Sequence, residues 1–224
     1  GSEMCIRDSL MQVASVLRDE VTTTDELIPS GETSSYRSNP LKLAEFALSR
    51  RDPDYVPRAK ATQVLEASRA AGAVPPVLAE VLRSLDLPES ALARMHIGSV
   101  IFANKPGDGS AREQAASCQR VLGGCANICY EFATKRYRSN CVNWGMLPFT
   151  LAEGAAFDGD AGDFVYVPDV REKLARGDEE FPAVLVHSGK AQPITLYLKN
   201  TSAEERELLL TGCLMNHYAA QNRR

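Results

Sequence analysis

The sequence predicts an α/β domain with a mixed sheet flanked by helices, and the prediction rests on three observations. Short apolar runs alternate with segments of helical spacing in the second half of the chain, a pattern typical of strands and helices packed in layers. The last two apolar runs, residues 183–189 and 192–199, are close enough to form an antiparallel hairpin, so the sheet is expected to be mixed. A length of 224 residues suits one sizeable domain.

The individual elements follow from the local patterns of apolar residues. Strands are expected at residues 11–17, 96–103, 125–132, 163–169, 183–189 and 192–199. Helices are expected at residues 40–50, 110–123, 133–144 and 202–221. The long polar segment between the first strand and the first helix is expected to be a functional loop, because loops of that length are uncommon inside compact domains.

Residues 52–94 are expected to form a helical insert that packs on the domain without a chemical role. The apolar stripe of its first helix is predicted to be Ala61, Val64, Leu65, Ser68 and Ala71, with Gly72 at its end. Its second helix restarts at Pro75 and Pro76, and the predicted stripe is Leu78, Val81, Leu82 and Leu85.

Composition and charge exclude several classes of protein. The net charge of −4 gives no general attraction to nucleic acid or to anionic membranes. No apolar run approaches the roughly 18 residues that span a bilayer, and no secretory pattern opens the chain. A cytoplasmic location is therefore expected. The first nine residues, GSEMCIRDS, match no predicted element, so residues 1–10 are interpreted as a tag or assembly leftover and residues 11–224 as the domain.

The cysteines of the domain favour core packing over metal binding. They are Cys118, Cys125, Cys129, Cys141 and Cys213, and none of them forms a Cys-x-x-Cys pair. Without a secretory signal they are expected to be reduced thiols, which behave as small apolar side chains when buried. No metal or cofactor is expected to bind to this chain alone.

Ser110 has two interpretations. Ser110-Ala-Arg-Glu113 has the spacing of a capping box, as does Ser202-Ala-Glu-Glu205 before the last helix, and on spacing alone the cap is favoured. However, the preceding Gly-Asp-Gly turn leaves backbone amides open at a helix N-terminus, where anions bind. Arg112 adds a bidentate donor for carboxylate or phosphate, and a serine in such positive potential is stabilised as an alkoxide.

Polar residues in the early loop are equally open to two interpretations. Thr24, Asp25 and Arg37 lie on a glycine-containing connection. Taken alone, they fit a solvated loop with local bonds between side chains and backbone.

Taken together, the two segments resemble the C-terminal swivel domain of the aconitase family. In that family a Thr-Thr-Asp loop carries a glycine and then an arginine six residues later, and here these are Gly31 and Arg37. The second signature runs from a Gly-x-Gly-Ser-Ser-Arg-Glu turn through a leucine-glycine pair and a phenylalanine helix to a Gly-Leu-Leu-Pro-like ending. The matching residues are Gly107, Gly109, Ser110, Arg112, Glu113, Leu122, Gly123, Phe132, Arg138, Ser139, Asn140, Gly145, Leu147 and Pro148.

The resemblance implies a swivelling β/β/α-type domain and a hydro-lyase activity of the aconitate hydratase kind on a hydroxy-tricarboxylate of tricarboxylic acid metabolism. It implies Ser110 as the catalytic base, with Asp25 in the acid/base and orienting network. It also implies Arg37, Arg112 and Thr24 as substrate-binding residues for a small polycarboxylate. The 4Fe-4S cluster of the complete enzyme is expected in partner domains, in the same chain or in a large subunit, because no cysteine here matches the family's cluster ligands.

Two departures keep alternatives open. The family's second serine is Ala111, and the histidine after the glutamate is Gln114. The chain is therefore expected to be part of an aconitate hydratase-like enzyme, with the small subunit of an isopropylmalate dehydratase-like enzyme or a catalytically silent structural or regulatory paralogue as alternatives. RNA binding is disfavoured by the acidic charge.

Overall fold

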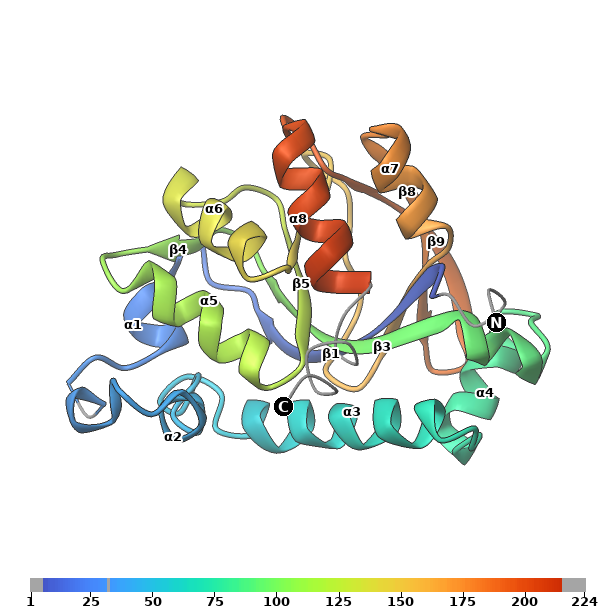
Figure 1. Ribbon diagram of the computed structural model, residues 1–224, viewed down its shortest axis with the longest axis horizontal. Coiled ribbons are helices and arrows are strands. Elements are labelled where there is room, and N and C mark those ends of the chain that lie inside the picture. Colours follow the sequence, from blue (N-terminus) through green and yellow to red (C-terminus); the bar gives the residue numbers. More distant parts are fainter. Residues whose placement is uncertain (1–5, 32, 215–224) are drawn as a thin grey trace.

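The structure, a computed structural model, describes residues 6–31 and 33–214 of the chain. At its centre, seven strands form a closed barrel in the order β1-β3-β5-β6-β9-β8-β7 (Figure 1). The strands are β1 (Asp8–Leu17), β3 (Met95–Ala103), β5 (Gly124–Cys129), β6 (Leu147–Thr150), β7 (Phe164–Val167), β8 (Glu180–His187) and β9 (Lys190–Tyr197). Inside the barrel the rings of Phe102 and Phe157 stack, with their centroids 4.5 Å apart.

Strand direction places all the parallel strand ends at one end of the barrel. The strands β1, β3, β5 and β6 run parallel, whereas β7, β8 and β9 join them through antiparallel pairs. The mixed sheet is confirmed, as is the β8–β9 hairpin. The closure into a barrel is a finding that the sequence did not predict. Loops that follow parallel strands gather at one edge, which is where α/β proteins place their sites.

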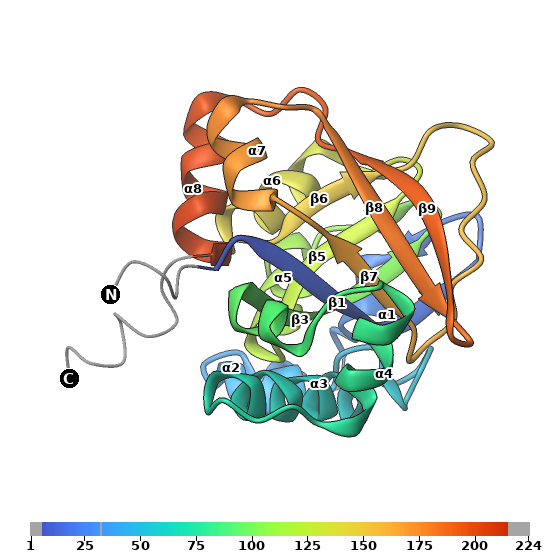
Figure 2. The same cartoon turned by 90° about the vertical axis from the view of Figure 1, so that its right-hand side faces the viewer.

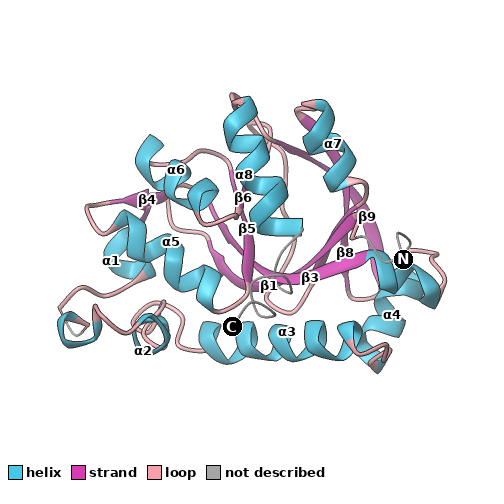
Figure 3. Ribbon diagram, viewed as in Figure 1, coloured by secondary structure: helices cyan, strands magenta, loops and turns pink. Residues whose placement is uncertain are grey.

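Helices surround the barrel on the outside (Figure 3). They are α1 (Thr24–Leu27), α2 (Pro40–Ala44), α3 (Tyr55–Ala70), α4 (Pro76–Ser84), α5 (Arg112–Val121), α6 (Lys135–Asn143), α7 (Val170–Arg176) and α8 (Ala203–Leu214), with 3₁₀ turns at Ser34–Tyr36 and Glu89–Arg94. Figure 2 shows α3 and α4 below the sheet, with α7 and α8 together on another side. The end of the helix predicted at residues 202–221 lies outside the described residues.

The N-terminal boundary of the domain differs from the prediction. Residues Asp8, Ser9 and Leu10, assigned above to a leftover, form the first part of β1, and Ser9 and Leu10 are buried. They pair with Met95, His96 and Ile97 of β3. The structure thus places these residues in the domain, because pairing with β3 and β7 forms a strand that their short sequence does not reveal. Residues 1–5 lie outside the described part of the chain.

The helix predicted at residues 40–50 ends early, as α2 (Pro40–Ala44) followed by turns. Leu48 has a φ of 55°, in the left-handed region that interrupts a helix. Its backbone N–H donates to the carbonyl of Leu27, and its side chain is fully buried. A tertiary contact thus overrides the helical spacing, and Leu41 is left 72% exposed.

The helical segment at residues 52–94 is present, but the buried face of its first helix is not the predicted one. The buried residues of α3 are Tyr55, Val56, Ala59 and Thr62, whereas Val64 of the predicted stripe is 65% exposed. Beyond Ala59 the inner face of α3 is held by polar side chains: Thr62 donates to Gln12 (2.7 Å), and Glu66 accepts from the backbone of Ile97 (2.9 Å). Hydrophobic spacing cannot reveal a face that is held by hydrogen bonds. The stripe Leu78, Val81 and Leu82 of α4 is buried as predicted.

None of the described helices is long and apolar enough to cross a membrane.

Candidate active site

Two loops that are far apart in the sequence are joined at one end of the barrel. The strand β2 (Thr22–Thr23) follows β1, and β4 (Pro106–Asp108) follows β3. They form a separate parallel pair in which Thr22 faces Pro106 and Thr23 faces Asp108. As a result α1, β4 and the start of α5 lie together at the left of Figure 1. The structure thus brings the Thr24–Asp25 segment next to the segment that contains Ser110.

A glycine permits the close approach of the two loops. Gly109 has a φ of +128°, which L side chains rarely adopt. A Cβ atom at this position would lie closer than 3.0 Å to Oγ1 of Thr24. Thr24 is buried at the start of α1, so its side chain packs directly against the Gly-Asp-Gly turn.

Tyr137 and Thr134, at the start of α6, pack against the same turn. Gly107 has a φ of +102°, and a Cβ there would overlap the ring of Tyr137. The hydroxyl of Thr134 donates to the carbonyl of Gly107 (3.1 Å) and also accepts from the backbone N–H of Tyr137 (3.1 Å), which caps α6. The Gly-Asp-Gly turn therefore rests on the N-terminus of α6.

Tyr137 is itself fixed by a closed ring of buried hydrogen bonds. Its hydroxyl donates to Asn127 (2.6 Å), the Asn127 amide donates to Gln119 (2.7 Å), and the Gln119 amide donates to Tyr137 (2.9 Å). All three side chains are at most 3% exposed. Burial raises the pKa of Tyr137 well above its usual value, so the hydroxyl keeps its proton. A fully satisfied network of this kind gives the turn a rigid base.

Ser110 is not a helix cap. The helix α5 begins at Arg112, its N-cap position is Ala111, and no side chain caps it. Ser110 is exposed, and no described residue hydrogen-bonds to its hydroxyl. By contrast, the capping box at Ser202 is complete: its Oγ accepts from the N–H of Glu205 (3.1 Å), whose carboxylate accepts from the N–H of Ser202 (3.1 Å). The cap that spacing favoured at Ser110 is wrong, because the Gly-Asp-Gly turn is tied to α1 and α6 and does not fold back onto α5.

A real capping box that the sequence analysis missed starts the neighbouring helix. The Thr23 hydroxyl accepts from the N–H of Glu26 (3.2 Å), and the Glu26 carboxylate accepts from the N–H of Thr23 (2.7 Å). The spacing Thr-x-x-Glu was available as a signal. This cap fixes Thr24 and Asp25 in the first turn of α1.

Asp25 is half-exposed and held in its ionised form. One carboxylate oxygen accepts from the N–H and the hydroxyl of Ser30, at 3.0 and 2.9 Å, and the other lies 3.4 Å from a guanidinium nitrogen of Arg50. The Ser30 bonds, and less strongly Arg50, hold the pKa of Asp25 below its usual value. Asp25 is therefore an acceptor at neutral pH. Arg50 was not predicted as part of the site, because no local pattern in the sequence links it to a residue 25 positions away.

The two predicted arginines differ in their surroundings. Arg112 is half-buried, and its Nε is buried without a hydrogen-bond partner among the described residues. Arg37 is exposed at the end of the 3₁₀ turn Ser34–Tyr36, and the structure records no ion pair for it with a described residue. The helix α2, which follows Arg37, packs against α5. Arg112 thus offers a donor near the turn that no described residue satisfies, and Arg37 is a cation on the adjoining loop that no described carboxylate pairs with.

The described cysteines do not fit an iron–sulfur cluster. Cys118, Cys125, Cys129 and Cys141 are buried free thiols. Burial raises the pKa of Cys118 and of Cys141 to about 12, which opposes the thiolate form that binds iron. Among the described residues, one group has possible metal-ligand atoms that all lie within 4.8 Å of one another, and it contains no cysteine.

We therefore expect that anaerobic reconstitution of this chain with iron and sulfide yields no stoichiometric cluster. Because the thiols are buried in their protonated form, the purified chain should show no charge-transfer absorption in the visible range and no bound iron after desalting. About four irons per chain, together with such a band, would contradict this expectation.

Part of the chain is similar in sequence to known proteins. Residues 93–154, which include β3, β4, α5 and α6, match the aconitase C-terminal domain family. The chain is 32% identical over 119 residues to a putative mitochondrial aconitate hydratase of Emericella nidulans, covering 52% of this chain and 15% of the relative. It is 32% identical over 113 residues to the mitochondrial aconitate hydratase of Schizosaccharomyces pombe, covering 50% and 14%. It is 44% identical over 59 residues to aconitate hydratase A of Bradyrhizobium diazoefficiens, covering 26% and 6%.

A solved structure shares the fold over almost the whole chain. The 3-isopropylmalate dehydratase of Methanocaldococcus jannaschii aligns with a TM-score of 0.53 and 19% identity, covering 96% of this chain and 95% of the other. The aligned part of this chain spans 15% or less of the length of the aconitate hydratases named above. The predicted resemblance to the aconitase-family swivel domain is confirmed.

Proposed function

We propose that this chain is the substrate-binding and base-supplying domain of an aconitate hydratase-like hydro-lyase, which removes water from a hydroxy-tricarboxylate and adds it back. The β2–β4 pair is the observation that carries the proposal. It places the Ser110 turn beside the Thr24–Asp25 segment, as a site built from both loops requires. A 4Fe-4S cluster would supply the Lewis acid. We place it in cluster-bearing partner domains, because the described cysteines of this chain do not fit it.

In the proposed reaction, Ser110 takes the proton from the carbon next to a substrate carboxylate. Its hydroxyl is exposed and is not used as a cap, so it is available to the substrate. The open amides of the turn and the guanidinium of Arg112 give the positive potential that favours an alkoxide. Asp25, ionised and held by Ser30, accepts a hydrogen bond and orients the substrate hydroxyl. Thr24 fixes the relative position of the two loops and contributes to substrate binding.

Two cations would bind the substrate carboxylates. The buried Nε of Arg112 has no partner among the described residues, and a buried donor without a partner is costly. A substrate carboxylate would satisfy it in a bidentate manner. Arg37 would bind a second carboxylate from the adjoining loop.

The proposed location is cytoplasmic, whereas two of the relatives above are described as mitochondrial.

The test is a hydratase assay on the complete enzyme, with this chain joined to or mixed with its cluster-bearing domains. Turnover of aconitate supports the main proposal. Turnover of isopropylmalate alone identifies the small subunit of an isopropylmalate dehydratase-like enzyme. Absence of turnover with a loaded cluster and an assembled complex identifies a silent paralogue, an alternative favoured by the substitutions Ala111 and Gln114.

Replacing Arg112 by lysine should weaken substrate binding in the complete enzyme. An ammonium group cannot reproduce the bidentate geometry of a guanidinium, so we expect KM to rise by about tenfold or more. Arg83→Lys is the matched control, because this residue lies on α4, and α4 and β4 are on opposite sides of Figure 1. Equal KM values for the two variants would remove Arg112 from the substrate site.

A further inference from the structure

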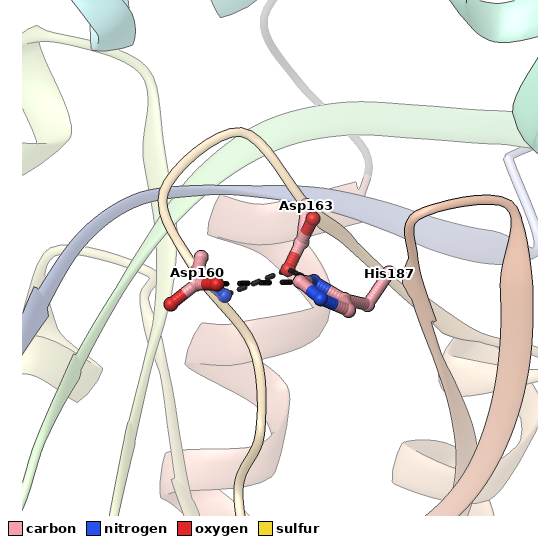
Figure 4. A group of neighbouring side chains, drawn as sticks. All are labelled: Asp160, Asp163 and His187. Carbon is pink, nitrogen blue, oxygen red and sulfur yellow. Dashed lines mark hydrogen bonds and ion pairs between the residues drawn. The ribbon is translucent and has the colours of Figure 1, made fainter.

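A histidine and two aspartates converge at the β6–β7 loop and the β8–β9 turn, away from the β2–β4 pair. Nδ1 of His187 lies 2.6 Å from Oδ2 of Asp163 and 3.9 Å from Oδ2 of Asp160 (Figure 4). One possible ligand atom from each of the three residues lies within 4.8 Å of the other two. Imidazole nitrogen and carboxylate oxygen are ligands that Zn²⁺ and related divalent ions prefer.

The backbone around these side chains is fixed by the sheet. The N–H of Val13 donates to the carbonyl of Asp163 (2.8 Å), and the N–H of Gly162 donates to the carbonyl of Val13 (2.7 Å). His187 ends β8 directly before a tight turn in which Ser188 and Gly189 both have positive φ values. The ligands therefore come from two segments with a defined relative position, which lowers the cost of ordering a site.

The cluster has more carboxylates than cationic groups, and a bound cation would balance this excess of negative charge. Two carboxylates, those of Asp160 and Asp163, lie beside the one imidazole of His187. In the described part of the chain, the ion pairs of Asp160 and Asp163 are made with His187 and with no lysine or arginine. Elsewhere on the surface, aspartates such as Asp19 and Asp178 are paired with arginines.

We propose that Asp160, Asp163 and His187 form a binding site for a divalent transition-metal ion of the Zn²⁺ class. The ion replaces the proton shared by Nδ1 of His187 and Oδ2 of Asp163, and these two atoms move apart to about 3.4 Å, the separation of ligand atoms that each lie ~2.1 Å from a tetrahedral ion. Water completes the coordination. The ion links the β6–β7 loop to the β8–β9 turn. This site is independent of the function proposed above, because none of its residues belongs to the β2–β4 region.

A cobalt titration of this chain, freed of metal by chelation and kept at pH 8, tests the proposal. We expect one equivalent of Co²⁺ to bind, with weak d–d absorption and no thiolate charge-transfer band. Asp160→Asn should weaken binding by at least about tenfold, and His187→Gln should do the same. Zn²⁺ at saturation should raise the Tm of the parent chain and leave the Tm of Asp160→Asn unchanged.

The controls separate this site from other causes of binding. Asp54→Asn changes an exposed aspartate outside the cluster and should bind cobalt like the parent. The Asp160 side chain is 72% exposed, so its replacement should not affect folding even if His187→Gln does. A thiolate band, affinity unchanged in Asp160→Asn, or no binding at millimolar cobalt would each overturn the proposal.

Discussion

Ser110→Ala is expected to lower the turnover of the complete enzyme by about 10²- to 10⁴-fold, the range that a general base contributes. Substrate binding should be largely retained, because Arg37 and Arg112 remain. The stability of the domain should change little, because no described residue depends on the Ser110 hydroxyl. In this variant, turnover should therefore fall while the free energy of unfolding stays close to the parent value.

Ser202→Ala is the matched control for that experiment. Its capping box is complete, so the substitution should cost about 1 kcal/mol of stability and leave turnover unchanged. Initial rates and urea unfolding of both variants give the comparison. If Ser110→Ala turned over at the parent rate, the assignment of Ser110 as the base would be wrong.

Gly107→Ala is expected to have the largest effect on stability, at about 2–5 kcal/mol. The new methyl group would meet the ring of Tyr137, and φ is +102°. The ring cannot move aside freely, because its hydroxyl is bonded to Asn127 and Gln119 in the buried network. Either the Gly-Asp-Gly turn or α6 must shift, and activity in the complete enzyme should fall with stability.

Gly154→Ala separates steric overlap from backbone strain. Gly154 has a φ of +79°, and nothing lies within 4 Å of the position its Cβ would take. The substitution should cost only about 1 kcal/mol, the strain of a left-handed backbone. Urea unfolding of the two variants measures the difference. Equal costs would show that the turn at Gly107 is not supported by Tyr137.

The strands β3 and β5 were predictable because their side chains are buried almost continuously. Of the residues in β3 and β5, every one except His96 is buried, and such apolar runs are visible in the sequence. By contrast β6 has four residues, and the two-residue β2 exists only through its pairing with β4. Elements this short cannot show a repeating pattern of apolar residues in the sequence. The closure of the barrel likewise depends on the pairing of β6 with β9, far apart in the sequence.

The residues of the candidate site could be proposed from the sequence, whereas their contacts could not. The family resemblance proposed Ser110 and Asp25, and spacing alone suggested a cap at Ser110 that does not form. The decisive contacts are between distant segments: Thr24 against Gly109, and Arg50 with Asp25. Arg50 has no sequence signal, because its role follows from the turns after α2.

The pairing of β2 with β4 has a mechanical consequence. Backbone hydrogen bonds join the two loops, and Thr24 packs against the turn that precedes Ser110. If the domain rotates relative to other domains in the proposed complete enzyme, both loops would move as one rigid body. The spacing between Ser110 and Asp25 would then be the same in open and closed arrangements, and only the distance to groups outside the domain would change. Domain rotation would therefore gate access to a geometry that this chain has already assembled.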